Sequence, residues 1–117
     1  MKLTGSKTEQ EHRQQLVCSR NDLFENREKA RILSSLYKQY PEMKTAYTLN
    51  WIPEQGEDIY YFLINKNIIA IVEIDRLDSS SEPIIEDLSI SEYKRKLSKA
   101  DQIKLAVAID LACSDIA

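Results

Sequence analysis

The sequence predicts an α+β domain in which an antiparallel meander of three to four strands packs against helices, in the order ααβββ(β)αα. Apolar residues in the segment 23–40 recur at spacings of three and four, as one stripe of a helix requires. The period then changes to two in the middle of the chain, which is typical of half-buried strands. With 117 residues, 43% of them hydrophobic, residues 1–117 are expected to form a single domain.

Two helices are predicted before the first strand. The residues Ser-Lys-Thr-Glu at 6–9 fit a capping box, so a polar helix should begin there and end near Cys18. Asn21 or Asp22 is the expected cap of the second helix, because a short polar side chain can accept a hydrogen bond from a free backbone N–H. Pro41 ends this helix, since the residue before proline disfavours helical geometry.

Strands are predicted where apolar and polar residues alternate. In the first strand, Tyr47, Leu49 and Trp51 should share one face, and a turn should follow at 53–56. Asparagine tolerates positive φ, so residues 65–67 are expected to form a tight hairpin connection. We expect helices to cover one side of the resulting sheet. The predicted strands are residues 47–51, 58–64 and 68–74, with a short edge strand at 84–88.

Two further capping boxes, at 89–92 and 98–101, predict a short helix and then a final helix. The final helix is apolar around most of its circumference, so it should be the central core helix, held against the sheet. The two cysteines, Cys18 and Cys113, are expected to be free thiols packed as small hydrophobes. The single histidine, His12, is expected to be a solvated surface residue.

Most catalytic and cofactor motifs are missing from the sequence. One histidine and two distant cysteines cannot supply a zinc site, and two isolated glycines cannot form a phosphate-cradling loop. Glu73 and Asp75 form a carboxylate pair that suits a divalent cation or a glycosidase couple, although a solvated strand end is the favoured interpretation. We therefore predict no enzyme activity, no catalytic residue, no metal and no cofactor.

The chain has no apolar run of the length needed to span a bilayer, and its N-terminus lacks the apolar stretch of a signal peptide. A cytoplasmic location is therefore expected, with no membrane contact. The densest basic cluster lies in residues 94–104, but the isoelectric point near 5.2 argues against direct binding of nucleic acid.

Charge is distributed unevenly along the chain. The net charge is −3, but residues 50–92 hold ten acids and two bases, giving −8, whereas the remaining residues carry +5. Aromatic residues lie within the acidic segment, and aromatics beside charges are typical of binding hot spots. This pattern predicts a surface complementary to a basic partner. The expected contact residues are Trp51, Glu54, Glu57, Asp58, Glu73, Asp75, Asp78, Glu82, Glu86 and Asp87.

In size, charge and mixture of elements, the whole chain resembles bacterial immunity proteins that neutralise toxins of contact-dependent growth inhibition and related polymorphic toxin systems. Those toxins are often nucleases with basic substrate channels, and their immunity proteins look like acidic plugs. The resemblance implies a monomer or weak dimer that binds and occludes a cognate basic nuclease toxin. Two alternatives stay open: a type III secretion chaperone-like adaptor, which would be a dimer, and a small-ligand or enzyme domain that uses carboxylates.

Overall fold

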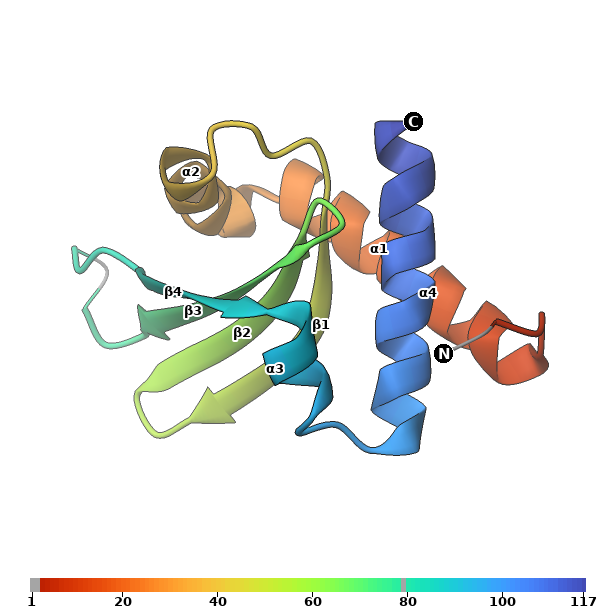
Figure 1. Ribbon diagram of the computed structural model, residues 1–117. Coiled ribbons are helices and arrows are strands. Elements are labelled where there is room, and N and C mark those ends of the chain that lie inside the picture. Colours follow the sequence, from red (N-terminus) through yellow and green to blue (C-terminus); the bar gives the residue numbers. More distant parts are fainter. Residues whose placement is uncertain (1–2, 79) are drawn as a thin grey trace.

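The computed structural model describes residues 3–78 and 80–117 and has the predicted α+β architecture. Its elements are α1 (Lys7–Glu25), the short 3-10 helix η1 (Arg27–Lys29), α2 (Ala30–Gln39), β1 (Ala46–Glu54), β2 (Glu57–Ile64), β3 (Ile68–Asp75), β4 (Ile84–Ser89), α3 (Ile90–Lys94) and α4 (Lys99–Ile116). The strands form an antiparallel sheet in the order β1-β2-β3-β4, so the expected edge strand is present. Figure 1 shows this sheet lying between α2 and the pair α1 and α4.

Helices cover both faces of the sheet, so the prediction of a single covered side is wrong. On one face, Phe62 and Val72 belong to a buried core that includes Leu36 of α2. On the other face, Leu63 belongs to a second core, which includes Leu105 of α4. The physical reason lies in the central strands, β2 and β3, which carry apolar side chains on both faces. Strands buried on both faces need such continuous apolar runs.

The first helix is longer than predicted. It passes through the expected cap at 21–22, and the chain breaks instead at Asn26, whose side chain accepts a hydrogen bond from the backbone N–H of Glu28 at 3.0 Å. Leu16 and Leu23, two turns apart, are both buried beneath this helix. The two side chains lie on the same side of the helix only if the helix is continuous between them. Their burial therefore outweighs the preference of Asn21 or Asp22 for a helix start.

Strand β1 contains a β-bulge, which overturns part of the predicted alternation. The pairing with β2 shifts register at 48–50, so one extra residue lies on β1. Because strand side chains alternate with a period of two, one extra residue reverses the faces beyond it. Tyr47 is therefore buried on the α4 side, whereas Trp51 pairs with Tyr60 and stacks on its ring on the α2 side, with ring centroids 6.3 Å apart.

The predicted turns and caps are largely confirmed. Asn65 adopts a φ of 51° in the β2–β3 hairpin, as its residue type suggested. Ser89 and Ser98 cap α3 and α4, each accepting a hydrogen bond from a backbone N–H three residues ahead. The β1–β2 turn contains only two residues rather than four, with Gly56 at a φ of 84°, and Pro53 belongs to the strand.

The final helix lies against α1 and β1, and its small and apolar side chains are buried there as expected. Two other predictions are wrong. Cys18 and Cys113 are free thiols, but both are exposed rather than packed as small hydrophobes. Both ring nitrogens of His12 are buried and have no hydrogen-bond partner among the described residues, because His12 lies one turn before Leu16 on the buried stripe of α1.

Candidate partner-binding surface

The β1–β2 hairpin and the ends of β3 and β4 extend beyond α3 and α4, toward the lower left of Figure 1. There, alternate residues of all four strands point to the side of the sheet on which α4 packs, but α4 does not reach them. We call this uncovered area the acidic face. It consists of Asn50, Ile52, Glu54, Glu57, Ile59, Tyr61, Ile71, Glu73, Asp75, Ile84 and Glu86.

Five carboxylates of the acidic face are not neutralised by the protein's own bases. They are Glu54, Glu57, Glu73, Asp75 and Glu86, and none of them forms an ion pair with a lysine or arginine within residues 3–78 and 80–117. Glu57 lies directly opposite Glu54 on one neighbouring strand and opposite Asp75 on the other. Like charges directly opposite each other destabilise a sheet, so the free protein carries this row at a cost.

Apolar side chains lie among these carboxylates. Ile52 is 37% exposed and Ile84 is 59% exposed. Leu77, just after β3, is 85% exposed and contributes to the same region. The acidic face therefore combines uncompensated negative charge with apolar area available for contact.

Two adjacent hollows indent the acidic face. The first, of about 340 Å³, lies between the sheet and the α3 region, and Tyr61 and Tyr93 stack in its wall with ring centroids 5.6 Å apart. It is lined by Asn50, Ile52, Tyr61, Ile71, Glu86, Leu88, Tyr93, Lys96 and Leu97. The second, of about 350 Å³, is lined by Gln55, Gly56, Glu57, Glu73, Asp75, Leu77, Ser81, Glu82 and Ile84. The first is mainly apolar and the second contains four carboxylates.

Three of the predicted contact residues face the other side of the sheet. Trp51 donates a hydrogen bond from Nε1 to Asp58 at 3.2 Å, and Asp58 also lies 3.6 Å from the guanidinium of Arg76. Asp87 accepts a hydrogen bond from the hydroxyl of Tyr40, at the end of α2. The protein's own side chains therefore engage Asp58 and Asp87, and the bulge in β1 turns Trp51 away from the acidic face.

Two predicted residues, Asp78 and Glu82, lie in the loop between β3 and β4. Hydrogen bonds from the side chain and backbone of Ser80 lower the pKa of Asp78, so its charge is held within the loop. Glu82 lines the second hollow and lies 3.7 Å from Lys38. This loop borders the acidic face, although Ser79 of the predicted polar segment lies outside the described residues.

Sequence reasoning missed the aliphatic members of the acidic face, namely Ile52, Ile59, Ile71 and Ile84. Apolar residues at alternating strand positions are usually core, so they gave no signal of a surface. The sequence did contain one indication. Ile71, Glu73 and Asp75 are alternate residues of one strand and therefore lie on the same face, and a face that ends in two carboxylates cannot be covered completely by apolar side chains.

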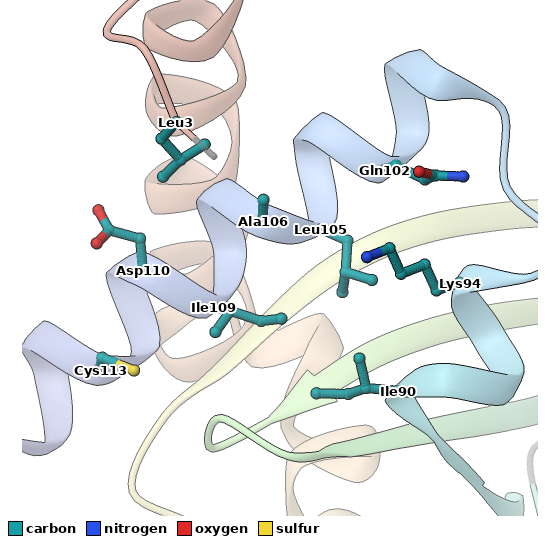
Figure 2. A pocket seen from close by; sticks show the side chains of 9 residues that line it. All are labelled: Leu3, Ile90, Lys94, Gln102, Leu105, Ala106, Ile109, Asp110 and Cys113. Carbon is teal, nitrogen blue, oxygen red and sulfur yellow. The ribbon is translucent and has the colours of Figure 1, made fainter. Parts of the chain in front are cut away.

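A separate hollow of about 320 Å³ lies on the other side of α3, between the N-terminal segment and α4. Figure 2 shows Leu3 above Ala106 and Asp110 of α4, with Ile90 and Lys94 of α3 facing Leu105. Its carboxylate, Asp110, pairs with Arg13 at 2.9 Å. The carboxylate of this hollow is therefore paired, unlike the five of the acidic face, and its other charged residue, Lys94, is a base.

No group of three or more His, Cys, Asp or Glu side chains in the described part of the chain is placed to hold a metal ion. Within residues 3–78 and 80–117, no helix is both long enough and apolar enough to cross a membrane. Comparison with protein-family models, with curated proteins and with solved structures finds no match for this chain.

Proposed function

We propose that this protein is an inhibitory binding module of the immunity-protein type. It covers a basic protein, such as a nuclease toxin, with its acidic face and blocks the partner by occlusion. One observation carries the proposal: five carboxylates without an ion pair among the described residues surround exposed aliphatic side chains on an uncovered sheet face.

The apolar residues would supply the affinity of such a complex. Removing apolar surface from water contributes about 25 cal/mol for each Å². Exposed apolar area with a polar rim is typical of protein interaction sites. Ile52, Ile84 and Leu77 provide such area, and the carboxylates form its rim.

The carboxylates would supply speed and selectivity. A surface of one sign raises the association rate of an oppositely charged partner by a factor of about 10 to 1,000 and repels partners of the same sign. A basic partner also relieves the repulsion along the row Glu54, Glu57 and Asp75. Since these side chains stand on hydrogen-bonded strands, little ordering of the backbone accompanies binding.

Charge reversal within and outside the acidic face tests the proposal. The test variant is Glu57→Lys, Glu73→Lys, Glu86→Lys, and the control, with the same change in net charge, is Glu11→Lys, Glu25→Lys, Glu42→Lys, at exposed positions elsewhere. Tagged proteins are used to capture partners from the native host. The wild type and the control should retain a protein with a basic domain, whereas the test variant should lose it.

The captured partner is then expressed with and without this protein. The partner alone should arrest cell growth or degrade nucleic acid, and co-expression of the wild type or the control should prevent this. Retention of the partner by the test variant would refute the role of the acidic face. Failure of co-expression to block the partner's activity would refute inhibition as the function.

A further inference from the structure

The two hollows of the acidic face specify the partner more closely. We infer that the partner presents a helix on which a large apolar side chain lies one turn from an arginine or lysine. This inference rests on the proposed function and assigns a separate role to each hollow.

The floor of both hollows is the β3–β4 ladder. The cross-strand pair Ile71–Glu86 lies under the first hollow, and the pair Glu73–Ile84 lies under the second. These are successive pairs on the same face, so they lie about 6.6 Å apart along the strands. Two side chains of one partner segment must therefore be separated by a similar distance to occupy both hollows.

The first hollow suits an apolar side chain. Its walls contain two stacked tyrosine rings, Tyr61 and Tyr93, together with Leu88 and Leu97. Its volume of about 340 Å³ leaves room for one large side chain. Apolar anchors in aromatic-lined hollows at the centre of a surface are typical hot spots of protein interfaces.

The second hollow suits a cation. Glu57, Glu73 and Asp75 lie on its sheet side, and Glu82 closes it from the loop. Of these, only Glu82 lies within ion-pair distance of a base among the described residues, at 3.7 Å from Lys38. A guanidinium has five N–H donors, so it can satisfy several carboxylates at once, and an ammonium has three.

A helix meets these requirements better than an extended segment. The acidic face offers side chains rather than free backbone groups, because β2 and β3 are paired on both sides and the unpaired edges of β1 and β4 lie at its margins. An extended peptide lying across it would bury its own N–H and C=O groups without partners, whereas a helix satisfies them internally. Side chains four residues apart on a helix have Cβ atoms about 5–6 Å apart, which approaches the spacing of the two hollows.

Two helical peptides of about 20 residues test the inference, since shorter helices are unstable in water. Both have the same composition of Leu, Arg, Ala and Gln. In the first, each Leu is followed by Arg four residues later, and in the second, the Arg residues lie on the opposite side of the helix. Binding to the whole protein is followed by NMR, after helicity is matched by circular dichroism.

The first peptide should bind at least about tenfold more tightly than the second, in line with one charge-assisted hydrogen bond. It should shift the amide signals of Tyr61, Ile71, Glu73 and Ile84. The variant Glu57→Gln, Glu73→Gln should abolish this preference. The control Glu11→Gln, Glu42→Gln should retain it.

Equal affinities of the two peptides for the acidic face would overturn the paired-anchor inference and leave the proposed function standing. Absence of binding by the first peptide, or shifts confined to another surface, would also overturn the inference. The proposed function fails separately, through the charge-reversal capture from the host, which uses no peptide.

Discussion

Asp115, near the end of α4, connects three elements through its two oxygens. Oδ2 accepts hydrogen bonds from Thr45 at 2.7 Å and from the hydroxyl of Tyr47, and Oδ1 accepts one from Arg20 at 3.0 Å. Partial burial alone would raise the pKa of Asp115, but the hydrogen bonds from Tyr47, Thr45 and Arg20 outweigh it and lower the pKa. The carboxylate therefore holds α4 against β1 and α1.

Replacing Asp115 with alanine should lower the free energy of unfolding by about 2 kcal/mol, because the hydroxyl of the buried Tyr47 loses its charged acceptor. Asp110→Ala is the matched control. It also removes a carboxylate of α4 that pairs with an arginine of α1, but the two side chains are 40% and 50% exposed, so the loss should stay below about 1 kcal/mol. Urea unfolding measures both, and equal losses would contradict the structural role of Asp115.

Glu9 caps the N-terminus of α1, and its carboxylate makes the free energy of unfolding depend on pH in the acidic range. Its carboxylate accepts hydrogen bonds from the backbone N–H groups of Thr4 and Gly5, at 3.0 and 2.9 Å, and from the hydroxyls of Thr4 and Ser6. These bonds, those from the two backbone groups foremost, lower its pKa to about 2 from an ordinary value of 4.5. A proton therefore binds Glu9 more weakly in the folded protein than in the unfolded chain.

The stability that Glu9 contributes should accordingly be complete above pH 4.5 and should be lost as the pH falls from 4.5 toward about 2. Glu9→Gln should remove this part of the pH dependence, whereas Glu11→Gln, on the exposed side of the same turn, should leave it unchanged. Carboxyl NMR titration and unfolding at several pH values check the two statements. A titration midpoint of Glu9 near 4.5 would show that the capping contacts are absent.

At the scale of the elements, the junction between α1 and α2 depends on Asn26. Asn26→Ala should reduce the free energy of unfolding by about 1 kcal/mol, since the N–H of Glu28 loses its cap. Asn21→Ala should change it far less, because Asn21 lies within the helix and, among the described residues, its side chain accepts hydrogen bonds only from the side chain of Arg20. Thermal unfolding of the two variants distinguishes the two helix boundaries. If the helix began at the predicted cap, Asn21→Ala would be the more destabilising of the two substitutions.

Elements whose boundaries depend on nearby residues were predictable from the sequence. The capping boxes of α1, α3 and α4 each span four residues, and Asn65 needs only its own backbone conformation. The continuation of α1 past residue 21 and the bulge in β1 depend on contacts with distant parts of the chain. Local patterns do not contain that information, so these two features were missed.

At the scale of the whole molecule, the two cores share one sheet and should unfold together. Leu36→Ala under α2 and Leu105→Ala under α4 should each reduce the free energy of unfolding by about 2–5 kcal/mol, because both side chains are buried. Leu77→Ala, at an exposed position, should have little effect. Circular dichroism of the helices and fluorescence of Trp51 should report one coincident transition in every variant. Two separate transitions would show that the cores are independent.

The candidate surface was predictable in its charge but only partly in its position. Glu73 and Asp75 lie two residues apart at the end of one strand, so the strand period places them on one face, and the pairing with β2 brings them together with Glu57. Asp58 and Asp87 follow Glu57 and Glu86 by one residue, so the strand period places them on the α2 side. The contacts that engage them there, with Arg76 and Tyr40, depend on distant parts of the chain. Composition alone cannot separate carboxylates that face solvent from those that the fold uses internally.

The bulge in β1 determines which side chains of the outer half of that strand lie on the acidic face. Because of one extra residue, the outer half of that strand turns isoleucine and glutamate toward the acidic face and tryptophan and proline toward α2. Deleting a single codon at the bulge would exchange these two rows without replacing any other amino acid. Under the proposed function, a change in strand length at this position would therefore alter the side chains that the acidic face presents to its partner.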